Sequence, residues 1–468
     1  QEIMNVAKDI IQLTKAVDEK IAEKARRYDE IEALKPWAEL DVPMNYKGTK
    51  KTGFLLGTIF AIIGRISWNR VNELSVLVIV IIPLGLISFF LGELIARKYK
   101  IKNMYKFNII NKIEEKNNIT TIVLFLCLFF VIITTVLLLL EIKKICAYYG
   151  FYSKNISELL AFYRTKTELF STSLTQENIS VSFIVKQMKK ISEVINIVIS
   201  FLFIRRFINK ELKNNILNTI LLFFIMFVGL IQTFLNSGGR SILMHFLVAY
   251  LIMYMLNLIE KNKNRNTSNI KLIMQMGCIA IVIFVIFYAI LPLVGRSSSY
   301  KFVDYITFYI GSPIPSFSTF IEKNAGLNQQ IGSETFSSIY YMLNRFGIIK
   351  YSKPFTLEWL SFSDGLASNV YTSMRCYYHD FGILGVIVLQ FIFGYVYTKF
   401  YLKAKNSKLN LWKMIYAYYA YILIDQIRTE QFYGLINTST IAMLIMFLAV
   451  YLLIFCRVKK GKKEYELE

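Results

Sequence analysis

Residues 118–140 read NITTIVLFLCLFFVIITTVLLLL, a run of 23 residues without one charged side chain. As an α-helix this run would be about 35 Å long, which is enough to cross the roughly 30 Å hydrocarbon core of a bilayer. Eight further runs of similar length and character follow or precede it. The nine predicted spans are 74–96, 118–140, 187–207, 215–234, 241–259, 272–294, 382–402, 411–429 and 437–456. With a shorter apolar stretch at 54–68, the sequence predicts an all-α, polytopic membrane protein with about nine to ten transmembrane helices.

The composition agrees with this fold class. Of 468 residues, 55% are hydrophobic and 18% are charged, whereas a soluble domain carries about 25% charged residues. The formal net charge is +22, but residues 1–58 hold ten Lys or Arg and ten Asp or Glu. The excess therefore lies in 59–468, mostly in short loops between apolar runs, which is typical of membrane topology and of contact with anionic lipid. We expect no nucleic acid partner.

The basic loops predict an orientation. Every second connection is rich in Lys and Arg, and these segments are 97–117, 205–214, 260–271, 403–413 and the tail 457–468. By the positive-inside rule they lie in the cytoplasm, together with the C-terminus. The membrane helices then fall into 65–294 and 382–456, separated by a large extracytoplasmic loop, 295–381. Within that loop, Phe302–Ile310 and Phe336–Phe346 are predicted to be short amphipathic helices on the membrane surface.

The N-terminal segment has a different character. Apolar residues recur at spacings of three and four over residues 3–34, with charged residues between them, and Pro36 follows. This pattern predicts a coiled-coil-like helix. The sequence ALKPWAELDVPMNYKGTKKTGFLLGTI (33–59) resembles the cytoplasmic part of V/A-type ATP synthase subunit I. The resemblance covers residues 1–59 and implies a cytoplasmic coiled-coil-like arm.

Two glycines and an arginine precede the span that begins near Ser241. Gly238 and Gly239 allow close backbone approach, and a helix that starts at Ser241 directs its N-terminal amides toward a ligand bound beside Arg240. This arrangement suits a pyrophosphate, with Arg296 at the outer end of another span as a second cation. The alternative is a tight turn with interfacial arginines that reach lipid head groups.

The densest polar cluster is 368–382, directly before a predicted span. If this segment is helical, Arg375 and His379 share one face, while Asp380 points elsewhere. Either His379 or Asp380 could deprotonate a sugar hydroxyl. The alternative is an interfacial belt that anchors the span. His245, inside a span, is typical of a hydrogen-bonded packing residue.

Four motifs together resemble the oligosaccharide repeat unit polymerases, the Wzy-type O-antigen and capsule polymerases of bacteria. They are FLNSGGRSILMHFLVAYLI (234–252), YIGSPIPSF (309–317), GSETFSSIYYMLNRFG (332–347) and SNVYTSMRCYYHDFGILG (368–385). The resemblance covers roughly residues 65–456. It implies a GT-C-like glycosyltransferase of the bacterial cytoplasmic membrane that polymerises undecaprenyl-diphosphate-linked oligosaccharide units on the outer face. It also implies a flippase and a chain-length regulator as partners, and no nucleotide sugar. Because the chain has two histidines and no CxxC spacing, we expect no metal site, and we expect no cofactor.

The resemblance also implies roles for individual residues. It assigns Arg240, Arg296 and Arg375 to the substrate diphosphates, and Asp380 or His379 to catalysis as the base. From the residues themselves, we expect Gly238 and Gly239 to contribute to the diphosphate site and Asn369 and Tyr371 to bind the acceptor. Two alternatives remain open, a transporter or flippase of lipid-linked sugars and the membrane subunit I of a V/A-type ATPase.

Overall fold

The computed structural model describes the following parts of the chain: 74–99, 113–115, 119–170, 181–235, 240–261, 282, 285–286, 288–289, 301–323, 327–351, 357–362, 367–407 and 409–458. The predicted arm at 1–59, most of the predicted span 272–294 and the basic tail from 459 onward lie outside the described residues.

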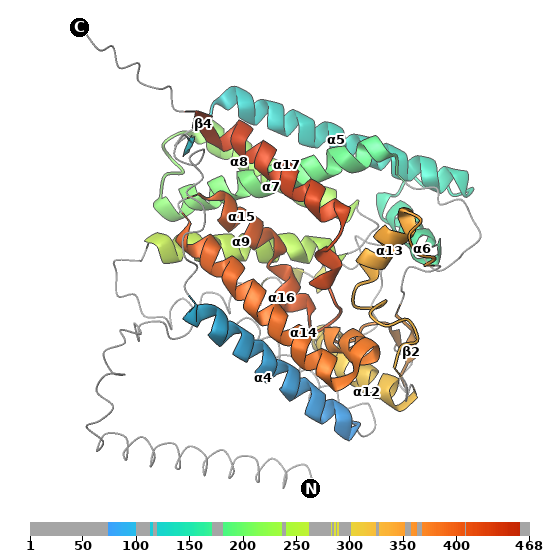
Figure 1. Ribbon diagram of the computed structural model, residues 1–468. Coiled ribbons are helices and arrows are strands. Elements are labelled where there is room, and N and C mark those ends of the chain that lie inside the picture. Colours follow the sequence, from blue (N-terminus) through green and yellow to red (C-terminus); the bar gives the residue numbers. More distant parts are fainter. Residues whose placement is uncertain are drawn as a thin grey trace, which may run out of the picture. The chain divides into compact units, whose positions relative to one another are not determined.

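The described fold is all-α (Figure 1). The helices are α4 (Val76–Lys98), α5 (Thr121–Tyr148), α6 (Ile156–Phe170), α7 (Phe183–Asn209), α8 (Ile216–Phe234), α9 (Arg240–Lys261), α11 (Phe302–Gly311), α12 (Pro313–Lys323), α13 (Ser337–Arg345), α14 (Ser373–Asn406), α15 (Leu411–Tyr419), α16 (Tyr421–Asp425), the 3-10 turn η4 (Tyr433–Leu435) and α17 (Thr438–Phe455). Two short antiparallel strand pairs join β1 (Ile113–Glu115) to β4 (Cys456–Val458) and β2 (Leu360–Ser361) to β3 (Ala367–Ser368).

Of the helices in the described ranges, five are long and apolar enough to cross a membrane. They are α4, α5, α8, α9 and α14. The prediction of a multi-pass membrane protein therefore agrees with the structure. Helix α7 is also long, at 27 residues, but its first turns carry charged side chains. The predicted span 411–429 is divided into α15 and α16, and the expected loop helices near 302–310 and 336–346 are present as α11 and α13.

The helices enclose two main apolar clusters. The larger one joins α5, α7, α8, α9, α15 and α17 around buried side chains such as Phe201 and Phe447. The second joins α4, α12 and the start of α14 around Phe317 and Tyr377. Helices α4 and α14 lie side by side (Figure 1). They approach closely because a Cβ atom added at Gly394 would overlap the carbonyl oxygen of Phe89.

Helix α14 starts nine residues before the predicted span at 382. Its first turns, from Ser373, precede a break at Gly382, where the backbone has φ 66° and ψ −160°. Glycine has no Cβ and adopts this left-handed conformation without strain. The break allows the polar segment 373–381 to be helical while it turns away from the axis of the membrane segment.

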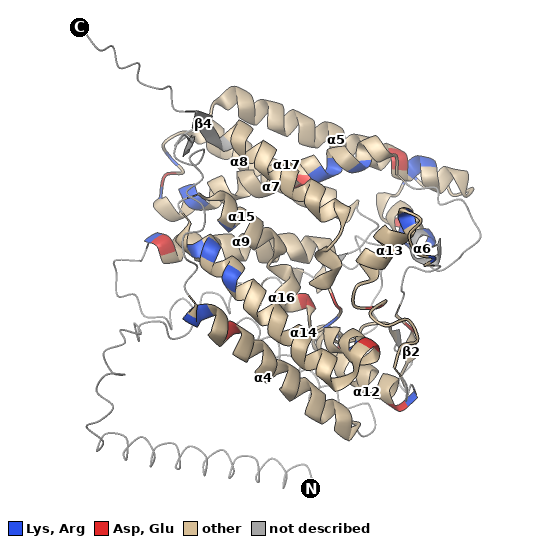
Figure 2. Ribbon diagram, in the orientation of Figure 1, with Lys and Arg blue, Asp and Glu red and all other residues tan. Residues whose placement is uncertain are grey.

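Several helix ends meet at one end of the bundle. Lys413 contacts Glu260 at 2.7 Å, Lys261 donates to the carbonyl oxygen of Ile208, and Lys399 donates to that of Tyr99. Basic residues at the C-terminal ends of α4 and α14 lie on this side, the left of Figure 2. We call it the basic end.

The opposite end joins different segments. The Ser75 amide donates to Ser318 Oγ at 2.7 Å, and Ser338 Oγ donates to the Gly434 carbonyl at 3.0 Å. This end carries the start of α14, the loop helices α12 and α13, and η4.

Candidate functional site

A buried carboxylate joins two predicted site residues. Glu334 Oε2 lies 2.6 Å from Arg375 Nη1, and Glu334 Oε1 lies 2.8 Å from His379 Nδ1. The expectation that Arg375 and His379 share a helix face is confirmed, because α14 already begins at Ser373. The side chains of Glu334 and Arg375 are 8% and 2% exposed, whereas that of His379 is 19% exposed. The histidine is therefore the member of this cluster that a ligand can reach most readily.

An aromatic ring completes the cluster. The Arg375 guanidinium lies 4.0 Å from the centre of the Phe320 ring, and the same ring meets the His379 ring edge-on with centroids 5.0 Å apart. A cation over an aromatic face is stabilised by the ring quadrupole. Phe320, from α12, thus fixes both side chains relative to Glu334.

Asp380 points away from His379, as the sequence predicts. Its Oδ1 accepts from Asn328 Nδ2 at 2.7 Å, and its Oδ2 accepts from the Thr335 amide at 2.7 Å. The His379 carbonyl accepts from the Asn328 amide at 2.8 Å. Asp380 is 2% exposed, so its oxygens are occupied by the loop that carries Glu334. In this arrangement Asp380 ties that loop to α14.

The two residues assigned to the acceptor lie just before α14. Tyr371 is 1% exposed and donates its hydroxyl to the Glu358 carbonyl at 3.0 Å. Burial raises the pKa of Tyr371 to about 12. Asn369 is half-buried. Tyr371 therefore packs in the core of this end rather than lining an open surface.

A second set of polar contacts involves segment 425–428. His245 Nε2 lies 2.8 Å from Asp425 Oδ2, and Arg428 Nη1 lies 3.4 Å from Asp425 Oδ1. The His245 ring stacks on Tyr421 with centroids 3.8 Å apart. The prediction of a hydrogen-bonded histidine in the α9 span is confirmed. The Arg428 carbonyl accepts from the Tyr371 amide at 3.0 Å, so the backbone of this segment joins the residues that precede α14.

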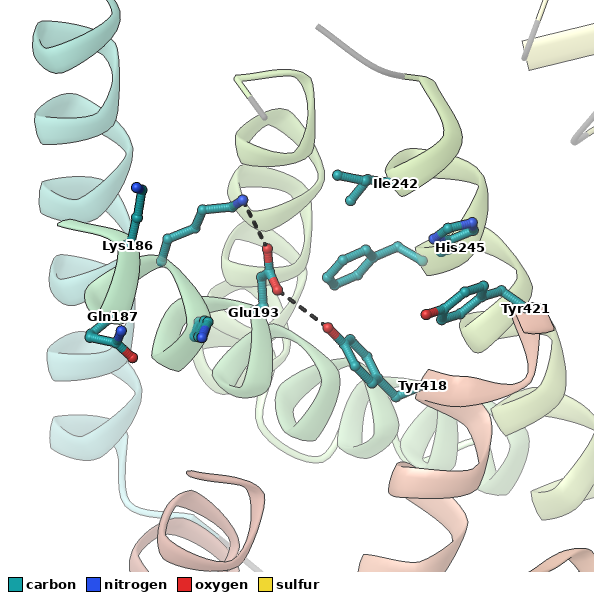
Figure 3. A pocket seen from close by; sticks show the side chains of 10 residues that line it. Lys186, Gln187, Glu193, Ile242, His245, Tyr418 and Tyr421 are labelled. Carbon is teal, nitrogen blue, oxygen red and sulfur yellow. Dashed lines mark hydrogen bonds and ion pairs between the residues drawn. The ribbon is translucent and has the colours of Figure 1, made fainter. Parts of the chain in front are cut away.

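Beside His245 lies a pocket of about 360 Å³ between α7, α9, α15 and α16 (Figure 3). Its lining residues are Lys186, Gln187, Lys189, Lys190, Glu193, Ile242, His245, Phe246, Tyr418 and Tyr421. Lys189 lies 3.6 Å from Glu193, which also accepts from the Tyr418 hydroxyl at 3.3 Å. Three lysines and one carboxylate therefore face this space.

The pocket lies at the start of α9, the helix that the Gly-Gly-Arg motif precedes. Arg240 is the first residue of α9, and Ile242 and His245 on its first turns line the pocket. Gly238, Gly239 and Arg296 lie outside the described residues, as does the side chain of Arg240. The structure thus brings Arg375 and His379 together at Glu334, directs Asp380 toward Asn328 and Thr335, and places the start of α9 at a separate pocket.

No pattern in the sequence pointed to Glu334 as a site residue, and the lysines of α7 were not among the predicted site residues. Glu334 lies inside the quoted motif at 332–347 but has no regular spacing to His379. The lysines had a signal, because three of them fall within five positions in the first turns of α7, at its end away from the basic end. No group of three or more His, Cys, Asp or Glu side chains within the described ranges is arranged to hold a metal ion.

Comparisons of the chain with models of protein families, with curated proteins and with solved structures found no match in any of the three.

Proposed function

We propose that this chain is a membrane glycosyltransferase that polymerises oligosaccharide units carried on undecaprenyl diphosphate. In this proposal it spans the bacterial cytoplasmic membrane about nine times. The basic end faces the cytoplasm, and the end with the Glu334 cluster faces outward. Support comes from the motif resemblance, from the membrane-spanning helices and from the positive-inside pattern.

The observation that carries the proposal is the pairing of His379 with Glu334 at the end of the bundle away from the basic end. The Glu334 carboxylate lies 2.8 Å from His379 Nδ1, although the geometry of this contact is not that of a hydrogen bond. In this proposal the negative charge of Glu334 favours a proton on Nδ1 and leaves Nε2 as the base. His379 is partly exposed, whereas both oxygens of Asp380 accept hydrogen bonds. The proposal therefore assigns the role of general base to His379 and a loop-anchoring role to Asp380.

The reaction follows from these roles. His379 Nε2 takes the proton from a hydroxyl of the acceptor sugar, and the oxygen forms a bond to the anomeric carbon of the donor. The bond from that carbon to the lipid diphosphate breaks, and the diphosphate leaves with the electron pair. Nearby cations lower the barrier because negative charge grows on the leaving group. Arg375 is a positioning residue in this scheme, since it contacts Glu334 at 2.6 Å.

Complementation tests the proposal. The chain is expressed in a bacterium that lacks its own repeat-unit polymerase but makes a matching unit, and the surface polysaccharide is resolved on a gel. We expect a ladder from the parent chain and single units from His379→Ala, since loss of a general base lowers the rate about 10²–10⁴-fold. Glu322→Gln is the matched control, because it removes an exposed carboxylate from the same loop.

Two outcomes contradict the proposal. One is a full ladder from His379→Ala. The other is the absence of a ladder from parent chain that is well expressed and inserted in the membrane, tested in hosts with different repeat units.

A further inference from the structure

We propose that the pocket between α7, α9 and α15–α16 is an anion site that binds the phosphoryl head group of a lipid. In the proposed reaction the ligand of this chemistry is the donor diphosphate, and that part of the assignment rests on the proposed function. The recognising residues are lysines of α7, not the arginines that the motif resemblance suggests.

The side chains that line the pocket are mostly positive among its charged groups. Lys186, Lys189 and Lys190 line the pocket against a single carboxylate, Glu193. That carboxylate already contacts Lys189 at 3.6 Å and the Tyr418 hydroxyl at 3.3 Å. Ammonium groups on flexible stems bind phosphate as adaptable point charges. The lining therefore favours an anion over a cation or a neutral ligand.

The three lysines lie far along α7 from the basic end. Helix α7 ends at the basic end, where its Arg206 lies in the last turn, and charge bias explains basic residues there. The lysines lie in the first turns, about 24–30 Å away along the helix axis. The positive-inside bias therefore does not account for three lysines that line a pocket at that end.

The size and the other walls of the pocket also suit a lipid phosphate. The volume of about 360 Å³ falls within the range of small-molecule sites. The 22-residue helix α9 begins with Arg240, and its first turns line the pocket with Ile242 and His245. The positive end of its dipole therefore lies near the pocket and adds to the attraction for phosphate. Aromatic and apolar side chains, including Phe246 and Tyr421, supply a wall for a lipid chain or a sugar.

A binding assay tests the site without glycosyl transfer. The full chain is placed in nanodiscs of zwitterionic phosphatidylcholine, and the Kd of labelled inorganic pyrophosphate is measured. We expect Lys190→Ala to raise the Kd at least about tenfold, because a hydrogen bond to a charged group contributes enough for that change. Lys190→Arg should retain most of the binding.

A second variant should change the Kd in the opposite direction. Glu193→Gln removes the carboxylate from the lining but keeps an oxygen that can accept from Tyr418, so it should lower the Kd severalfold. A residue with a purely structural role would not produce tighter binding. The matched control is Lys143→Ala/Lys144→Ala, which removes two exposed lysines from the corresponding end of α5, outside the pocket lining.

Competition identifies the source of the phosphoryl group. Undecaprenyl diphosphate and phosphatidylglycerol are each added to displace the labelled pyrophosphate. Preferential displacement by the diphosphate assigns the pocket to the donor, and equal displacement assigns it to lipid phosphate in general. Displacement by neither lipid overturns the lipid assignment.

The site itself is overturned if monodisperse parent protein does not bind, if Lys190→Ala leaves the Kd unchanged, or if the α5 control weakens binding equally. These results are separate from the complementation test. A chain that forms no polymer can still show lysine-dependent binding, and His379→Ala should abolish the ladder with an unchanged Kd.

Discussion

Glutamine at position 334 should destabilise the protein strongly. Glu334 is the carboxylate that both Arg375 and His379 contact, at 2.6 Å and 2.8 Å. With Glu334→Gln, the Arg375 guanidinium, only 2% exposed, loses its charge partner. Removing one partner of a buried pair costs about 3–5 kcal/mol, because the remaining charge stays in a poorly solvated site. We expect a loss of that size in the free energy of unfolding.

The pair should also show strong coupling. Arg375→Met alone leaves Glu334 with only the histidine, and it removes the cation from above the Phe320 ring. The double variant has no uncompensated buried charge, so its loss should be well below the sum of the two single losses. Residues in direct contact commonly couple by about 0.5–3 kcal/mol.

Equilibrium unfolding of the purified protein in mixed micelles measures these free energies. Glu322→Gln is the control for removal of a loop carboxylate, and as an exposed position it should change stability by less than about 0.5 kcal/mol. The reasoning is refuted if Glu334→Gln costs no more than the control. Additive losses in the double variant would also refute it, because they would mean that the two side chains do not interact.

Three further predictions test other parts of the fold. Burial raises the pKa of Glu430 to about 7, above the value of about 4.3 in the unfolded chain. As the pH rises between these two values, the unfolded chain loses the Glu430 proton and the folded chain keeps it, so the free energy of unfolding should fall. Glu430→Gln should remove this slope in thermal unfolding at pH 5 and pH 8, and an unchanged slope would contradict it. Gly394→Leu should push α4 away from α14, because the new side chain overlaps Phe89, and should lower the free energy of unfolding by about 1–3 kcal/mol or more. The control Val388→Leu, at an exposed position of the same helix, should be nearly neutral. Equal losses of stability in the two variants would argue against the close contact of α4 and α14. A cysteine replacing Lys350 should react with an impermeant thiol reagent added to intact cells, whereas one replacing Lys102 should react only after lysis, and the reverse pattern would invert the proposed orientation.

Hydropathy alone predicted most of the fold. Apolar runs of about 20 residues form membrane-length helices because lipid offers no hydrogen-bond partners to the backbone. Eight of the nine predicted spans coincide with described helices, with α15 and α16 together taking the place of one. Of the described helices, five are long and apolar enough to cross a membrane. The spacing of four between Arg375 and His379 likewise fixed their common face, because that relation is local to one helix.

Only the tertiary structure decided what those side chains meet. Glu334 reaches Arg375 from 41 positions earlier in the chain, through a loop that Asp380 holds, and no sequence period encodes such a contact. The pocket lysines of α7 face His245 of α9 and Tyr418 of α15 for the same reason. The pattern of apolar residues determines which segments become helices, but many arrangements of those helices would bury the same apolar surface. The positions of the few charged groups depend on the one packing in which each finds a partner.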